Sequence, residues 1–454
     1  MEKLFKLNEH GTNVKTELIA GLTTFLSMVY ILAVNPNVLS AAGMDRDAVF
    51  TATAISAALA TLCMAFLANY PVVLASGMGL NAYFAYSICV PMAQAGIADP
   101  WKIALTAVLC EGIIFILLSF FKFRETLVNK IPANLKLGIT VGIGLFITLV
   151  GLSGAGIVVS DSDVIVGLGS LSSPNLVLAM TGLIAIGIFH HFKITGGILW
   201  GILLTWLLGI AAQLCGWYVV DPALSNQSLI PDLSAIGSMP AAPSLFQFNF
   251  SYVAEHLLDF VLIVFSFLFV DLFDTVGVLI GVAEKGKLLD KNGNLPRVGR
   301  ALLSDAIGTT AGACLGVSTV TSYIDSGTGI SVGGRTGLTA LTAAVMFLLS
   351  LFFAPIFLAV PGFATAPALI FVGLTMMGTI KKMTFDGDIA DVLGGFMAII
   401  MMPFTYSIAN GIMFGMLFWI ILKICTGKIR DIHPIMWCSG VLFALNIGIK
   451  ILGK

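Results

Sequence analysis

The chain has 454 residues, of which 58% are hydrophobic and only 10% are charged. A soluble chain carries about a quarter of charged residues, so this composition excludes a soluble globular protein and predicts a membrane protein. The formal net charge of -1 gives no reason to expect a nucleic-acid partner. Apolar runs of about 15 to 25 residues, without the alternation of barrel strands, predict an all-α polytopic membrane protein.

The N-terminal residues 1–17 mix charges and lack a short apolar core followed by a small-residue cleavage site, so we expect a cytoplasmic N-terminus without a signal peptide. The seven Cys residues are scattered through apolar segments without a CxxC spacing. We therefore predict neither a metal site nor a cofactor.

Lys and Arg residues define the expected topology, because basic residues of short loops stay in the cytoplasm. They are absent from Ile194 to Glu284, which predicts that the polar connection 216–251 is extracytoplasmic. We therefore expect a multi-pass protein of the cell membrane whose two termini both lie in the cytoplasm. This topology predicts fourteen transmembrane segments, near 18–36, 47–69, 80–94, 102–121, 134–153, 175–191, 195–215, 253–283, 300–315, 328–335, 337–356, 364–379, 389–406 and 408–425.

The last apolar run, Pro434 to Leu452, belongs to the C-terminal tail 427–454. As a fifteenth span it would export Lys450 and Lys454, against the distribution of the other basic residues. We expect an interfacial or partly re-entrant tail.

An internal repeat relates the two halves. The sequence SGMGLN (Ser76 to Asn81) recurs as SGTGIS (Ser326 to Ser331), each time after a β-branched run. The segment ALTAVLCEGIIFILLSFF is echoed by GLTALTAAVMFLLSLFF, and the spacing from Pro to Gly at 132–144 recurs at 361–373. Three matches in the same order indicate duplication of a seven-span unit, as repeats 18–215 and 252–426. An odd number of spans makes the second copy inverted.

Inverted repeats are typical of secondary transporters, whose broken helices meet near the bilayer midplane. The glycines of the two SGxG motifs permit non-helical backbone there. We expect short antiparallel strands in segments 3 and 10, because extended backbone at membrane depth needs hydrogen-bond partners. The helix N-termini beyond them would point at a central cavity. The alternative is a purely structural role for both re-entrant loops.

Four acids lie inside predicted spans. Asp271 and Asp274 share one helix face in FSFLFVDLFDTVG, Asp325 lies at the second break, and Glu111 lies in the fourth span. An acid at the centre of a membrane helix costs about 2.5 to 3.5 kcal/mol, so each is a functional candidate. Structural alternatives stay open: Asp274 could brace Thr275, and Asp271 could serve helix packing.

Asp325 could instead cap a helix beginning near Gly327. Glu111 could be structural or serve coupling, and Asn81 could close a backbone hydrogen bond or contact a polar ligand. We expect three further acids, close to span ends, to be solvated: Asp305, Glu255 and Asp259.

A site of acids and an amide, without buried Lys or Arg, suits a neutral, planar ligand rich in hydrogen-bonding groups and repels anions. A carboxyl group in a pocket of low dielectric takes up and releases protons as the cavity changes sides, which supplies proton coupling. The candidates for proton coupling are Asp274, Asp325 and Glu111.

Five long motifs now point to a family. AGLTTFLSMVYILAVNP, GMGLNAYFAY, FLFVDLFDTVGVLIGV, STVTSYIDSGTGISVGGRTGLTA and PGFATAPALIFVG resemble the AzgA-like purine permeases of the nucleobase and ascorbate transporter family. The resemblance implies fourteen segments, with a core domain (18–121 and 252–356) and a gate domain (134–215 and 364–426). It also implies proton-coupled uptake of adenine, guanine or hypoxanthine, and a homodimer formed through the gate domains.

In that family, segments 3, 8 and 10 hold the purine. Together with the two breaks, the resemblance implies these substrate-binding residues: Asp274, Asp325, Asn81, Asp271, Gly79, Gly327, Thr328 and Gly329. One position departs from the family pattern, since segment 10 reads YIDS where the family usually has YIES. The shorter side chain of Asp325 either shifts the ligand or requires a bridging water.

Two other classes of function compete with this hypothesis. An anion exchanger of the sulfate-transporter type would share the inverted-repeat fold but needs a basic residue near the breaks, where only Arg335 comes close. An intramembrane enzyme would need a motif such as HExxH or DDxxD, and the sequence contains neither. We therefore expect a transporter and not an enzyme.

Overall fold

The computed structural model describes residues 2–119, 132–161, 165–219, 229–286, 288 and 295–452, and most of them are helical. Within these ranges, nine helices are long and apolar enough to cross a membrane. The expected all-helical membrane class is confirmed, whereas the count of fourteen segments stays a prediction.

Strands β2 and β3, which lie between α9 and α10, pair as an antiparallel hairpin. The sequence analysis did not predict them. The elements of the first half of the chain are α1 (Glu2–Phe5), α2 (Val14–Met28), α3 (Ile31–Ser40), α4 (Arg46–Cys63), the π-helix η1 (Met64–Ala68), β1 (Leu74–Ser76), α5 (Met78–Ala82), the π-helix η2 (Tyr83–Cys89), α6 (Val90–Gln94), α7 (Pro100–Ser119), α9 (Ala133–Gly154), β2 (Val158–Asp161), β3 (Ile165–Leu168), α10 (Pro174–His191) and α11 (Gly197–Leu214).

The second half begins with an extended connection that leads to the longest helix, α13. Its elements are η3 (Leu233–Ala235), α12 (Phe250–Glu255), α13 (Leu257–Gly286), α14 (Val298–Leu315), β4 (Val320–Ser322), α15 (Ser326–Val332), α16 (Gly337–Ser350), η4 (Leu351–Phe353), α17 (Ala354–Leu358), α18 (Gly362–Met377), η5 (Gly378–Lys382), α19 (Ile389–Phe404), α20 (Ile408–Cys425), η6 (Ile429–Asp431) and α21 (Pro434–Leu452).

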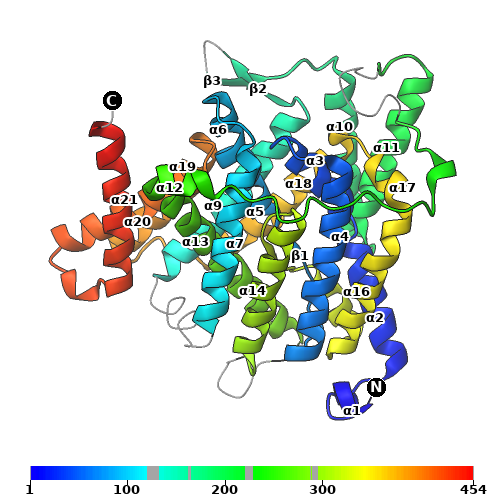
Figure 1. Ribbon diagram of the computed structural model, residues 1–454, viewed down its shortest axis with the longest axis horizontal. Coiled ribbons are helices and arrows are strands. Elements are labelled where there is room, and N and C mark those ends of the chain that lie inside the picture. Colours follow the sequence, from blue (N-terminus) through cyan, green and yellow to red (C-terminus); the bar gives the residue numbers. More distant parts are fainter. Residues whose placement is uncertain are drawn as a thin grey trace.

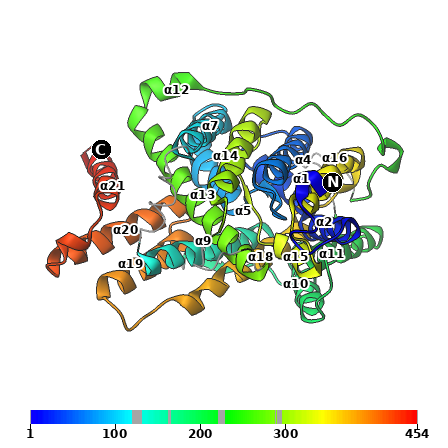
Figure 2. The same cartoon turned by 90° about the horizontal axis from the view of Figure 1, so that it is seen from below.

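The helices pack in two groups. In the first, α14 packs on α4 and α7, while α16 packs on α2 and α4 (Figure 1). In the second, α9 packs on α18 and α19, and α19 on α20. Seen from below, α9, α19 and α20 extend to one side of the first group (Figure 2). Helices from both halves of the sequence therefore build each group.

Strands β1 and β4 join the halves at the centre. They pair antiparallel, with Leu74 opposite Ser322 and Ser76 opposite Val320. Hydroxyl groups satisfy much of the remaining strand backbone: Thr61 Oγ1 bonds both the N–H and the C=O of Leu74, and Thr309 Oγ1 donates to the Val320 carbonyl. Extended backbone is thus tolerated inside the bundle because side chains replace water as partners.

The first span, Val14–Ser40, includes the expected segment 18–36 and contains a short turn between two helices. Helix α2 ends at Met28 and α3 begins at Ile31, so Tyr30 lies at the junction. The hydroxyls of Thr24 and Ser27 donate to carbonyls four residues earlier, a pattern that bends helices. Tyr30 is buried at this junction.

The C-terminal tail was expected to be either interfacial or partly re-entrant. Pro434–Leu452 is a single unbroken helix, α21, which packs on α20 and α13. It stands at the edge of the molecule in Figure 1. A re-entrant tail is therefore wrong, and an interfacial position stays a prediction.

Candidate functional site

A cavity of about 1140 Å³ receives residues from both helix groups. Strand β4, α15, α13 and the α2–α3 junction contribute to its wall from the first group, and α9, α10 and α18 from the second. Ligand pockets usually measure about 300 to 1,000 Å³, so this cavity exceeds what one small molecule requires.

Two acids from different elements share the wall. Asp274 comes from α13 and Asp325 directly precedes α15; both line the cavity and both are half-buried. Asp325 occupies the N-cap position of α15, but its side chain makes no capping hydrogen bond. The capping alternative is therefore wrong, and the carboxyl group is placed at the cavity.

The glycine motifs contribute backbone to the same wall. Gly79, Gly327 and Thr328 line the cavity, whereas Gly329 does not. A Cβ at Gly329 would overlap the Ala20 carbonyl and the Thr24 hydroxyl. Gly329 thus permits close packing of α15 on α2 and lies away from the cavity wall.

Asn81 lies outside the cavity wall, in a buried chain of hydrogen bonds. It accepts from Ser76 Oγ at 2.8 Å and donates to Asn35 Oδ1 at 2.7 Å, and Asn35 in turn donates to Thr53 Oγ1 at 2.7 Å. The amide is used internally on both sides. Asn81 therefore bonds side chains, whereas the sequence analysis expected either a backbone hydrogen bond or a contact with a polar ligand.

Asp271 is completely buried and belongs to a second polar cluster. Thr275 Oγ1 lies 3.1 Å from Asp271 Oδ1, 3.0 Å from Asp305 Oδ1 and 2.9 Å from Thr321 Oγ1. Thr275 therefore braces Asp271 and not Asp274. The expectation that Asp305 is solvated is wrong, because α14 turns it into this cluster with no exposed surface; Glu255 and Asp259 are exposed as expected.

Glu111 is also completely buried and lies outside the cavity wall. Thr319 Oγ1 donates to Glu111 Oε2 at 2.9 Å. Since Thr319 immediately precedes β4, Glu111 connects α7 to the approach of the second break.

Basic residues also line the cavity, against the expectation of a site without them. They come from the start of α9, the end of α10 and the segment after each of α10 and α18, and they are Lys136, His190, Lys193 and Lys382. All of them belong to or border the basic clusters that the sequence analysis placed in the cytoplasm. The cavity is thus lined by both acidic and basic side chains.

Glu17 is a structural residue that the sequence analysis missed because it belongs to the charged N-terminal stretch. It is completely buried, and its carboxylate accepts from the backbone N–H groups of Arg335 and Thr339 and from the Thr336 and Thr339 hydroxyls, at 2.6 to 3.1 Å. Arg335 donates to the Ile330 and Gly334 carbonyls. The turn that follows α15 is therefore fixed to α2.

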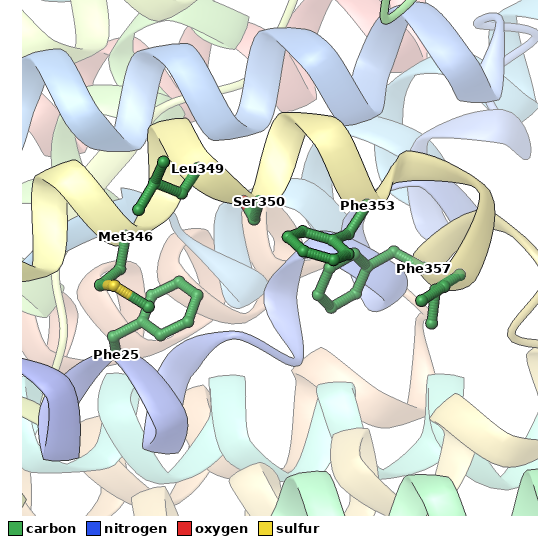
Figure 3. Close-up of a pocket in the computed structure, with 7 residues that line it drawn as sticks. Phe25, Met346, Leu349, Ser350, Phe353 and Phe357 are labelled. Atoms are coloured by element: carbon green, nitrogen blue, oxygen red, sulfur yellow. The ribbon is translucent and has the colours of Figure 1, made fainter. Parts of the chain in front are cut away.

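A second pocket, of about 220 Å³, lies beside α16 and is almost wholly apolar. Figure 3 shows Phe25 below α16, with Met346 pointing toward it. Its one hydroxyl, from Ser350, donates to the Phe347 carbonyl at 2.6 Å. Without converging polar groups, this pocket does not fit a hydrogen-bonding ligand.

Comparison with known proteins identifies the relatives of this chain. The model of the permease family Xan_ur_permease matches residues 15–414. The guanine/hypoxanthine permease PbuO of Bacillus subtilis is 43% identical over 98% of this chain and 99% of its own length. The adenine permease AdeQ of Escherichia coli is 41% identical over 98% of this chain and 96% of its own.

Among solved structures, the transmembrane domain of a cyanobacterial bicarbonate transporter, BicA, superposes with a TM-score of 0.65, covering 88% of this chain and 97% of that domain at 17% identity. At this identity the likeness shows the fold alone. Because permeases are transport proteins, the expectation of a transporter and not an enzyme is confirmed. The matched residues and the identities over nearly the whole length show that the chain belongs to the Xan_ur_permease family.

Proposed function

We propose that the chain imports purine nucleobases, namely adenine, guanine or hypoxanthine, together with a proton. Relatives named as adenine and as guanine/hypoxanthine permeases cover almost the whole chain and support this substrate class. The observation that carries the proposal is the pair Asp274 and Asp325 on one cavity wall.

The chemistry of that wall suits a purine. Carboxylates accept hydrogen bonds, and the edges of purine bases present ring N–H and amino donors. An acid pair would repel an anion, which argues against the alternative of an anion exchanger. The basic residues of the cavity come from other elements than the two acids, namely α9, α10 and the segments after α10 and α18.

The two helix groups supply the moving parts of the proposed mechanism. A core domain (18–121 and 252–356) would carry the acids, and a gate domain (134–215 and 364–426) would cover them from one side and then from the other. Asp274, Asp325 or Glu111 would take up the coupled proton. The basic residues of the cavity would lie at its cytoplasmic mouth, with both chain termini on that side of the cell membrane. The gate domains would pair in a homodimer.

Uptake of labelled hypoxanthine and adenine in cells without purine permeases tests the substrate, with unlabelled nucleobases as competitors. We expect saturable uptake by the wild type and none by Asp274→Asn. Glu255→Gln, which changes an exposed acid at a helix end, is the matched control and keeps wild-type uptake. Normal accumulation of purine by Asp274→Asn contradicts the assignment of the site.

Proton coupling needs a separate experiment. A protonophore should abolish accumulation in sodium-free medium, and an imposed inward proton gradient should restore it in vesicles. Accumulation that persists without a proton gradient contradicts symport with protons.

A further inference from the structure

Two hydroxyl groups at the cavity take part in no hydrogen bond within the described residues. Tyr30 lines the cavity at the α2–α3 junction and is 1% exposed, and its hydroxyl has no partner there. Ser322, the last residue of β4, also lines the cavity, and its Oγ is buried without a partner. A buried polar group without a partner costs about 1 to 3 kcal/mol, so Ser322 Oγ points to a ligand that completes it. The Tyr30 hydroxyl is a second group at the same cavity that is free to bind such a ligand.

The neighbouring tyrosine provides a contrast. Tyr323 lines the same cavity, but its hydroxyl donates to the Ser76 carbonyl at 2.5 Å across the strand pair. Its hydrogen is therefore used within the protein. Tyr30 lies within electrostatic range of both Asp325 and Tyr323 and keeps its hydrogen for another acceptor.

The acids alone cannot satisfy a purine. Ionised carboxylates only accept hydrogen bonds, whereas every purine also carries acceptors: its unprotonated ring nitrogens and, in hypoxanthine and guanine, the oxygen at carbon 6. Donors must come from other groups at the wall. The hydroxyls of Tyr30 and Ser322 are donors at the same wall as Asp325.

We propose that Tyr30 and Ser322 bind the acceptor atoms of the purine while Asp274 and Asp325 bind its N–H groups, an inference that rests on the proposed function. A hydroxyl can donate to an oxygen or accept from an amino group. The same two side chains therefore accommodate either a 6-oxo or a 6-amino purine.

Equilibrium binding of labelled hypoxanthine to the purified full chain in lipid nanodiscs tests the proposal. Tyr30→Phe and Ser322→Ala should each weaken binding about tenfold. Neither variant loses an internal hydrogen bond, so thermal unfolding should stay as in the wild type. Tyr86→Phe is the matched control, because that ring packs against Tyr406 away from the cavity wall, and its affinity should not change.

Ligand analogues separate a direct contact from an indirect one. 7-Deazahypoxanthine lacks one ring nitrogen of hypoxanthine and so removes one acceptor. Purine lacks the oxygen at carbon 6, and its unprotonated N1 is an acceptor where hypoxanthine has an N–H donor. We expect Tyr30→Phe to have less than a twofold effect on at least one of these analogues. Equal weakening of all three ligands, or unchanged hypoxanthine binding, overturns the proposal. If the wild type binds hypoxanthine and the variants behave as it does, only this inference fails; a wild type that binds no purine contradicts the proposed function itself.

Discussion

The two breaks have the same backbone plan but use their polar side chains differently. Each consists of a three-residue strand followed by a short helix, and the strands pair with each other. In the first break, Asn81 is bonded to Ser76 of strand β1 and to Asn35 of helix α3. In the second, Asp325 faces the cavity and makes no capping bond.

The repeat alignment makes this difference specific. Ser76 corresponds to Ser326, so the residue before it is Ala75 in the first break and Asp325 in the second. Ala75 is completely buried, whereas Asp325 is half-buried at the cavity. A duplicated scaffold therefore has one copy that positions the backbone and another that carries the charged group.

Replacement of the acid should have the largest effect. Asp325→Asn is expected to reduce purine affinity about 10- to 150-fold, because hydrogen bonds to a charged group contribute about 1.5 to 3 kcal/mol. The unfolding temperature should stay the same, and Asp325→Glu, the usual family residue, should retain uptake. An Asn variant with wild-type affinity would show that the two breaks do not differ in this way.

The amide of the first break should affect folding more than binding. Asn81→Ala leaves the Ser76 hydroxyl and Asn35 Oδ1 without partners in the interior, so we expect about 2 to 4 kcal/mol lower stability in denaturant unfolding. Ser331→Ala changes the corresponding residue of the second break, which is exposed and bonds only the nearby Thr328 carbonyl. If Ser331→Ala lost as much stability as Asn81→Ala, the proposed structural difference between the two breaks would be contradicted.

The glycines of the two motifs should also respond differently. Gly329→Ala places a methyl group against the backbone of α2, and we expect a loss of about 1 to 3 kcal/mol. At Gly79 the new Cβ would lie 2.8 Å from Ile143 Cγ2 of α9, a side-chain atom that can move. Gly79→Ala should therefore unfold close to the wild-type temperature but transport more slowly, since it widens the contact between the helix groups. Unfolding and uptake rates of the purified variants check both expectations.

An acid far from both breaks should have the smallest effect. Lys423 and Lys428 hold the pKa of Asp388 well below its usual range, with contacts of 2.6 and 2.9 Å. This stabilisation is present above the unfolded pKa of about 3.9 and is lost as the pH falls through the lower folded value. Asp388→Asn should cost about 0.5 to 1 kcal/mol at pH 7 and leave purine affinity unchanged. A changed purine affinity would show that the ion pairs of Asp388 are coupled to the purine site.

The sequence signals were strong where a residue is unfavourable in an apolar membrane helix. Glycines beside β-branched residues, and acids in apolar spans, are costly in lipid, so Asp274 and Asp325 stood out before any coordinates. Both lie at the cavity. A costly residue does not reveal its partner, however, and Asn81 was therefore assigned to the ligand although the interior binds it.

Other features left no such signal. Tyr30 lies in an apolar stretch without Gly or Pro on either side, and only the packing of α2 reveals the bend there. Asp305 lay close enough to a predicted span end to suggest solvent, and Glu17 belonged to a charged segment. The partners of Glu17 lie in the other half of the chain, and the Thr275 that bonds Asp305 lies on a different helix, α13. Periodicity along one segment cannot indicate such partners.

The pairing of Leu74 with Ser322 spans more than half of the polypeptide. During synthesis, the first strand must enter the bilayer long before its partner has left the ribosome. Until then its open edge has only hydroxyls such as Thr61 to bond, so the nascent first half cannot complete its own interior. We therefore expect the interior of this permease to assemble only after β4 of the second half has been synthesised and can pair with β1.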